Sequence, residues 1–284
     1  MTFQHYIITR FNISLNAQGY CPVCTDEYLD YRFPLFERYC FPSVKAQSCQ
    51  NFKWLVLFDA HTPERYLRRA ETLHQSYPNF IPCYMNIPEY ELVGKDEDYD
   101  DIENNPRVQV AITAFLRRYI EQQCGERPDF YVTTRLDSDD ALHRDMVASI
   151  QHRVHTDSRK VAYDFVYSYK YILSEGIVYR YLLKNGHFLT LVEPSTEELR
   201  SVLFCNHLHI DDFVKVEHIH QRPLQTELIH GGNVVNDFTE LTIGGLLYAP
   251  LHFHKQDFGY QKIHHSYKRT FWIMGSLVKQ RFIH

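Results

Sequence analysis

Long hydrophobic runs and an excess of basic residues are both absent from this sequence. No apolar stretch reaches the roughly 18 residues that a membrane-spanning helix needs. The 30 lysines and arginines are outnumbered by 35 aspartates and glutamates, and the formal net charge is −5. Proteins that bind nucleic acid through its phosphates usually carry a basic excess. The composition therefore argues against a membrane-spanning helix and against a nucleic-acid partner.

Glycine, proline and cysteine are scarce as well. The 284 residues include 11 glycines and 12 prolines, which excludes a collagen-like or low-complexity chain. Seven cysteines, an odd number in a long chain, favour a reduced, cytoplasmic setting over a disulfide scaffold. Residues 1–10 lack the charged start and long apolar stretch of a signal peptide. With 44% hydrophobic residues, the chain can bury a sizeable core without disulfide bonds.

Strand and helix patterns alternate along the first half of the chain. Short apolar runs bounded by polar residues predict strands over residues 5–11, 53–59, 80–87 and 130–136. Helices are expected over residues 28–41, from residue 62 onward, over 106–123 and over 143–154. This alternation predicts an α/β fold: a mainly parallel, mixed sheet with helices on both faces. Strands are also expected over 161–181, 187–192 and 202–209, within a more irregular second half.

Three carboxylates follow directly after the strand expected at 130–136. They belong to Asp137, Asp139 and Asp140. Ligands of open α/β sheets bind at the carboxyl ends of the strands, and residues two apart in an extended segment face the same way. Mg²⁺ and Mn²⁺ take oxygen ligands and often complete their shell with substrate phosphates. The pattern favours a divalent-cation site; the alternative is a polar turn in which Asp140 caps the next helix.

Other polar side chains end strands that should reach the same edge. Asp59 is suited to accept hydrogen bonds from a ribose or a base, and Arg10 and Arg135 to pair with phosphates. Thr9 and Asn12 lie at the end of the first expected strand. Local roles are the alternative: a turn or cap for Asp59, and ion pairs with neighbouring acids for the arginines.

Several of these stretches resemble a known family. They read YIITRFN at 6–12, YRFPLFERYCFPSV at 31–44, QNFKWLVLFD at 50–59, TTRLDSDDAL at 133–142 and IHGGN at 229–233. The chain resembles the putative rhamnosyltransferase family of bacterial glycosyltransferases, and the match covers most of residues 1–150. The resemblance implies a GT-A-like fold, a nucleotide-diphosphate sugar as donor, and a glycan or lipid-linked acceptor.

The resemblance also implies roles for individual residues. Asp137 and Asp139 match the Asp-x-Asp element that holds the metal and the nucleotide diphosphate, and His230 falls where some such enzymes supply a late histidine. The metal ligands expected are Asp137, Asp139 and His230, with Mg²⁺ or Mn²⁺ as the cofactor. The donor-binding residues expected are Thr9, Arg10, Asn12, Asp59, Arg135 and Asp137.

The general base is the least determined role. An inverting transfer needs a group that takes the proton of the acceptor hydroxyl. Asp211, Asp212 and Glu227 are the candidates, with the two aspartates slightly ahead. A retaining enzyme would not need this base, so the stereochemical outcome stays open.

The expected organisation has three parts. Residues 1–150 form the α/β half that binds the nucleotide sugar, 151–250 the acceptor-facing half of the same domain, and 251–284 a basic, aromatic C-terminal tail. A helix near the end of this tail has two readings. We favour packing of its apolar face on the domain; the other reading is a peripheral contact with the inner face of an anionic membrane.

Two other functions and one other metal remain as alternatives. A nucleotidyltransferase would share the acidic sheet edge, but residues 9–16 contain no glycine for a phosphate-binding loop. A non-catalytic glycan-binding protein would use the 21 tyrosines and 19 phenylalanines as stacking surfaces. Cys21 and Cys24, with Cys40 and Cys49, form a weaker zinc pattern, because only one close pair is present. The acidic segment 95–103 reads as a solvated loop.

Overall fold

The computed structural model of the chain describes residues 1–13, 22–86, 106–123, 125–157, 159–231, 242–263 and 266–281. The predictions for Cys21, for the acidic segment 95–103 and for residues 232–233 lie outside these residues. Among the described helices, none combines the length and the apolar composition that crossing a bilayer requires.

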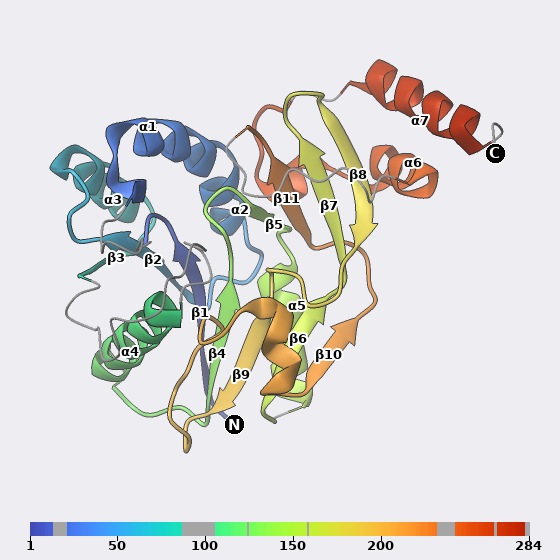
Figure 1. The fold of residues 1–284 in the computed structure, drawn as a ribbon. Helices are drawn as coiled ribbons and strands as arrows, with labels where there is room; N and C mark the ends of the chain where they lie inside the picture. The colour runs from blue at the N-terminus through green and yellow to red at the C-terminus, as the bar shows by residue number, and fades with distance from the viewer. Residues whose placement is uncertain are drawn as a thin grey trace.

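A seven-stranded sheet forms the centre of the molecule (Figure 1). Its strands are β1 (Phe3–Arg10), β2 (Lys53–Asp59), β3 (Phe80–Met85), β4 (Phe130–Arg135), β6 (Val161–Phe165), β9 (Thr190–Pro194) and β10 (Val216–Ile219). They lie in the order β10-β6-β9-β4-β1-β2-β3. The run from β4 through β1 and β2 to β3 is parallel, β10 is parallel to β6, and β9 runs antiparallel to its neighbours β4 and β6. The predicted mainly parallel, mixed sheet is therefore confirmed.

Helices cover both faces of this sheet, as its side-chain alternation requires. They are α1 (Asp26–Leu35), a π-helical stretch η2 (Phe36–Cys40), α2 (Phe41–Lys45), α3 (Glu64–Ser76), α4 (Pro106–Gln123) and α5 (Met146–Thr156), with a short 3₁₀ turn η1 (Pro22–Cys24) before α1. Neighbouring side chains on β1 point to opposite faces. Ile7 joins a core with Phe33 of α1 and Ile150 of α5, whereas Ile8 joins a separate core with Ile112 of α4.

A second, four-stranded sheet lies beside the first. It consists of β5 (Ala141–Leu142), β7 (Tyr167–Ile172), β8 (Ile177–Leu182) and β11 (Gln225–Ile229), in the order β5-β11-β7-β8. The remaining helices are the 3₁₀ segments η4 (His207–Asp212) and η5 (Lys255–Phe258), and α6 (Ile243–His252) and α7 (Tyr267–Arg281). Figure 1 shows α6 and α7 at the outer end of this sheet, across the molecule from α3 and α4.

The second half of the chain departs from the prediction in one element. The strand expected over 202–209 is wrong, because these residues form turns and the start of η4. The side chain of Asn206 accepts a hydrogen bond from the backbone of Leu208 and so caps η4. Strands from both sides of residue 150 share the main sheet. The division into a donor-binding and an acceptor-facing half stays a prediction.

Candidate active site

The acidic segment 137–140 lies at the carboxyl end of β4, between the two sheets. Strand β4 is held on one side by parallel β1 and on the other by antiparallel β9. The backbone of Leu136 still bonds to Ile8, and a hydrogen bond from Asp140 N to Asp137 O then turns the chain (3.2 Å). The chain next enters β5 of the second sheet. The acids are therefore placed where two rigid elements meet.

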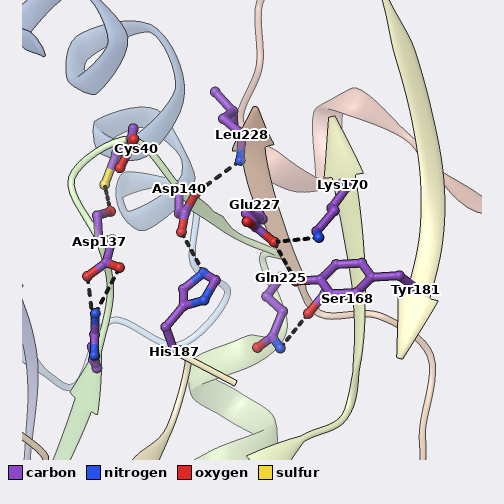
Figure 2. Close-up of polar contacts among 12 residues, drawn as sticks. Cys40, Asp137, Asp140, Ser168, Lys170, Tyr181, His187, Gln225, Glu227 and Leu228 are labelled. Carbon is purple, nitrogen blue, oxygen red and sulfur yellow. Dashed lines mark hydrogen bonds and ion pairs between the residues drawn. The ribbon is translucent and has the colours of Figure 1, made fainter. Parts of the chain in front are cut away.

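Asp137 is paired with an arginine of its own strand. Arg135 donates from Nε and Nη2 to the two carboxylate oxygens, at 3.2 and 3.1 Å. Burial by itself raises the pKa of Asp137, but Arg135, His187 and Arg10 together hold that pKa well below its usual range. The backbone oxygen of Asp137 also accepts from Cys40 Sγ at 3.6 Å (Figure 2). Asp137 is thus a fixed negative charge.

Asp140 is bound by two distant parts of the chain. His187, in the loop between β8 and β9, lies 3.0 Å from one of its oxygens, and the Leu228 amide of β11 donates to the other at 3.0 Å (Figure 2). Burial and the neighbouring Asp139 and Asp137 raise the pKa of Asp140 to about 7, although His187 opposes the rise. The pKa of His187 is lowered by burial but raised more by Asp140, to about 9. The alternative role of Asp140 as a helix cap is wrong, because α5 begins after Asp145.

Asp139 lies in a third buried network. Its Oδ2 is 2.8 Å from His230 Nε2 and forms an ion pair with Arg32 of α1. The other ring nitrogen of His230 is 2.9 Å from the hydroxyl of Tyr31. Burial raises the pKa of Asp139, but the hydrogen bond from His230 and the charge of Arg32 outweigh this effect. The pKa of Asp139 therefore lies below its ordinary value. The predicted neighbours Asp139 and His230 are brought together; their role as metal ligands stays a prediction.

The group whose spacing suits a metal ion differs in part from the predicted set. One ligand atom from each of Asp137, Asp140 and His187 lies within 4.8 Å of the others. Ligands about 2 Å from a shared ion lie at most about 4 Å apart, so two carboxylate oxygens and an imidazole would hold a divalent cation here after a small inward movement of the side chains. Imidazole suits Mn²⁺ better than Mg²⁺. Asp137 is common to both sets, and Asp139 and His230 lie beside it.

A small pocket opens next to Asp137. Its lining residues are Arg10, Gln109, Ile112, Arg135, Leu203, Cys205 and Asn206. Arg10 ends β1 and Arg135 ends β4, so the parallel pairing of these strands brings two guanidinium groups to one opening. His207, at the start of η4, interacts with the charges of Arg135 and Asp137, and burial lowers its pKa to about 4. Two arginines beside a carboxylate suit a polyanion bound together with a cation.

The remaining donor-binding candidates, Thr9, Asn12 and Asp59, lie at or just after the ends of β1 and β2 and form hydrogen bonds there. Thr9 Oγ1 accepts from the indole nitrogen of Trp54 at 2.9 Å. The side chain of Asn12 bonds to Asp59 N at 3.2 Å and to Thr62 Oγ1 at 2.8 Å. Oδ1 of Asp59 accepts from the backbone of His61 at 2.7 Å. These contacts give all three a structural role at the correct edge of the sheet, and their contact with a donor stays a prediction.

The three candidate general bases lie in two different places, one on β11 and two on η4. Glu227 lies on β11, where its carboxylate accepts from Tyr181 Oη at 2.7 Å and is 3.8 Å from Lys170 Nζ (Figure 2). Its charge contributes to the raised pKa of His187. Asp211 and Asp212 are exposed at the end of η4, where Asp212 is 3.6 Å from His209 of the same element. The structure therefore brings Glu227 toward the acids.

Three residues of the site were missed by the sequence-based prediction. Arg32 and Tyr31 lie in the stretch 31–44 that carries the family resemblance, which was the available signal. His187 gave none, because it is one of 17 histidines and lies in a loop far along the chain from Asp140. Its position depends on how β8 returns to β9, which the local pattern does not determine.

Comparison with known proteins identifies the family. The family described as "Putative rhamnosyl transferase" matches residues 22–239. The chain belongs to this family. The part of the chain that matches the rhamnosyl transferase family contains Arg32, the acids of segment 137–140, His187 and His230. No curated protein matches the chain.

Solved structures with a related arrangement share little sequence with this rhamnosyl transferase family member. S. aureus TarS residues 1–349 match at 10% identity and a TM-score of 0.42, over 80% of this chain and 60% of that one. Another TarS structure matches at 10% and 0.38, over 81% and 37%. A "putative nucleotide-diphospho-sugar transferase" from Desulfovibrio desulfuricans G20 matches at 8% and 0.36, over 79% and 82%. The chain therefore spans less than two thirds of either TarS chain.

Proposed function

We propose that the protein is a glycosyltransferase of the GT-A type. It transfers a sugar, with rhamnose as the first choice, from a nucleotide-diphosphate donor to a glycan or lipid-linked acceptor in the cytoplasm. The family match supports the class of reaction and the choice of rhamnose. The observation that carries the proposal is the convergence of Arg10 and Arg135 on one pocket at the carboxyl edge of the sheet, with Asp137 hydrogen-bonded to Arg135.

The arginines and the acids have different roles in binding the donor. Arg10 and Arg135 are placed to pair with the diphosphate, whose two charges match their fixed positive charges. Asp137, Asp140 and His187 would hold a divalent cation, which when bound offsets the charge that develops on the departing diphosphate. Arg32 and His230 orient Asp139 and compensate its charge.

Glu227 is the best placed acceptor-side base. Its carboxylate oxygen is held by Tyr181 and lies near Lys170, so the group is oriented before an acceptor arrives. A fixed carboxylate within reach of the acceptor hydroxyl takes its proton as the new glycosidic bond forms. This assignment implies inversion at the anomeric carbon.

The decisive experiment is a panel of nucleotide sugars, including nucleoside-diphosphate rhamnose, with and without Mn²⁺. We expect one donor to raise the melting temperature in the presence of Mn²⁺ and to release nucleoside diphosphate when an acceptor is added. Release of sugar 1-phosphate would instead indicate transfer of the nucleotidyl group and hence a nucleotidyltransferase. Failure of every nucleotide sugar to bind, with or without Mn²⁺, would contradict the proposal and favour a glycan-binding protein.

Two pairs of variants test the assignments. His187→Gln is expected to abolish stabilisation by Mn²⁺, while His218→Gln, which alters a histidine paired with Asp164 at 2.8 Å elsewhere in the sheet, retains it. Glu227→Gln is expected to lower the transfer rate about 100-fold through the loss of a general base, while Asp211→Asn leaves it unchanged. The reverse result for the second pair would move the base to η4.

A further inference from the structure

Helix α7 exposes three large aromatic side chains on one face. Tyr267 is 54% exposed, Phe271 64% and Trp272 60%. Tyr267 and Phe271 are four residues apart, so they lie on the same side of the helix. Trp272 is turned about 100° around the helix axis from Phe271, so the three side chains span an arc of roughly 140°. Burying such side chains is favourable, and exposing a cluster of them in water is costly. These three residues are the aromatic face of α7.

The opposite side of α7 is fixed to the second sheet. Ile273, Met274 and Leu277 pack on a core that contains Leu246 of α6 and Tyr179 of β8. Ser266 accepts from the Arg269 amide at the start of the helix, and its own amide donates to Gly176 between β7 and β8 at 2.7 Å. One side of α7 thus packs on the domain, as favoured from the sequence. The aromatic face points outward, so it is available for the alternative role, contact with a membrane.

The charge of the tail complements an anionic surface. Residues 251–284 contain one acid, Asp257, and six basic residues: Lys255, Lys262, Lys268, Arg269, Lys279 and Arg281. The chain as a whole has a net charge of −5, so positive charge is concentrated at this end. Lys268 is exposed within α7, whereas the Arg269 guanidinium lies 4.4 Å from the centre of the Trp272 ring and forms an ion pair with Glu175 in the turn between β7 and β8.

Helix α6, which packs against α7, contributes further exposed apolar surface. Its ten residues contain no aspartate, glutamate, lysine or arginine. Leu247 is 49% exposed and Leu251 is 72% exposed, four residues apart on one side of the helix. Two adjoining helices therefore both present apolar side chains to solvent at the same end of the molecule (Figure 1).

We propose that the aromatic face of α7 docks the protein on the surface of a membrane rich in anionic phospholipid. Amphipathic rings next to lysine and arginine are the side chains that settle at the boundary between headgroups and acyl chains. The basic residues supply attraction to acidic headgroups, and the aromatic rings supply the apolar insertion. Because α7 is already held by the second sheet, docking requires no refolding of the tail.

The two tryptophans make the test direct. Trp54 is fully buried and Trp272 is exposed, so a change in emission on adding vesicles reports the environment of α7. With vesicles of phosphatidylcholine and phosphatidylglycerol, we expect co-sedimentation and a shift of emission to shorter wavelength. Vesicles of phosphatidylcholine alone should bind at least about fivefold more weakly, and added salt should weaken the binding to anionic vesicles.

Variants locate the contact. Phe271→Ser is expected to lower vesicle affinity about tenfold, and Lys268→Gln about fivefold. Phe213→Ser, which alters a 54% exposed phenylalanine directly after η4, should leave the affinity unchanged. Melting temperatures of the variants near that of the parent protein show that folding is intact.

Three outcomes would overturn the proposal. The first is no association of the parent protein with anionic vesicles, and the second is an equal loss in Phe213→Ser and Phe271→Ser. The third is a dimer in solution that Phe271→Ser dissociates, which would assign the aromatic face to a second copy of the chain. Transfer to a water-soluble acceptor should be the same in Phe271→Ser, so docking and the proposed reaction are tested separately.

Discussion

Two strands of the main sheet end in acids at the same edge, yet their carboxylates are satisfied differently. At the end of β2, Asp59 bonds to the backbone of His61 two residues on. At the end of β4, two of the three acids find partners far along the chain: Asp139 in Arg32 and His230, and Asp140 in His187 and Leu228. A locally satisfied acid shapes a turn, whereas acids held by distant elements concentrate charge where several elements meet.

The difference teaches which acid clusters carry chemistry. Holding three carboxylates within four residues, two of them buried and one half-buried, is costly, because burial and mutual repulsion both disfavour the ionised forms. Here the cost is offset by arginines and histidines from α1, β4 and the loops after β8 and β11. Such arrangements, with perturbed pKa values, are typical of functional sites.

The largest effect is expected from the acids after β4. Asp137→Asn removes the fixed negative charge beside Arg135 and should lower the transfer rate on the order of 10² to 10³-fold. Steady-state rates with a saturating donor measure this loss. A loss smaller than that caused by Asp59→Asn would break the comparison between the two strand ends.

The partner of Asp139 provides the next test. Arg32→Gln leaves a buried carboxylate without its guanidinium and should lower the free energy of unfolding by about 3 kcal/mol. Denaturation with urea measures the change. The double variant Arg32→Gln/Asp139→Asn should recover part of the loss, and a strictly additive result would show that the two side chains are not coupled.

Acid pH should weaken the strand pair that supports the acids. His5 of β1 bonds to Thr134 of β4 at 2.8 Å, and burial lowers the pKa of His5 to about 3 from an ordinary value of 6.5. Between these values the unfolded state binds the extra proton, so stability falls as the pH drops, by about 1.4 kcal/mol per pH unit for this group.

His5→Asn should remove that contribution to the slope, measured by urea denaturation between pH 5 and pH 7. His207, with a pKa lowered to about 4, adds a similar slope of its own that this variant leaves in place. An unchanged slope in His5→Asn would show that His5 is not buried in its neutral form.

The smallest effect belongs to the end of β2. Asp59→Ala removes the hydrogen bonds to the His61 backbone and ring, and should cost about 1 kcal/mol of stability. If Asp59 also contacts the donor, the KM for donor rises by about tenfold while kcat changes little. An unchanged KM would limit Asp59 to shaping its turn.

The sequence determined the sheet edge well because the signals there are local. The apolar run before Asp137 and the run before Asp59 each specify a buried strand, and parallel pairing then aligns their ends. The helix over 106–123 was predicted with its observed bounds because its apolar spacing is regular.

The partners of the acids required information that no local pattern contains. His187 reaches Asp140 across 47 positions, and Arg32 reaches Asp139 through the packing of α1. Asp140 looked like a cap because a helix follows soon after, but the Leu228 amide occupies its oxygen. Residues 202–209 were expected to form a strand, but the cap at Asn206 starts a 3₁₀ segment there.

The two bonds of Asp140 join separate layers of the molecule. One oxygen holds the strand β11 of the smaller sheet, and the other holds the connection that returns the chain to β9 of the larger one. This carboxylate therefore links the two sheets. Because Asp140 and His187 also lie within 4.8 Å of Asp137, any movement of one sheet relative to the other would change the spacing of the candidate metal ligands.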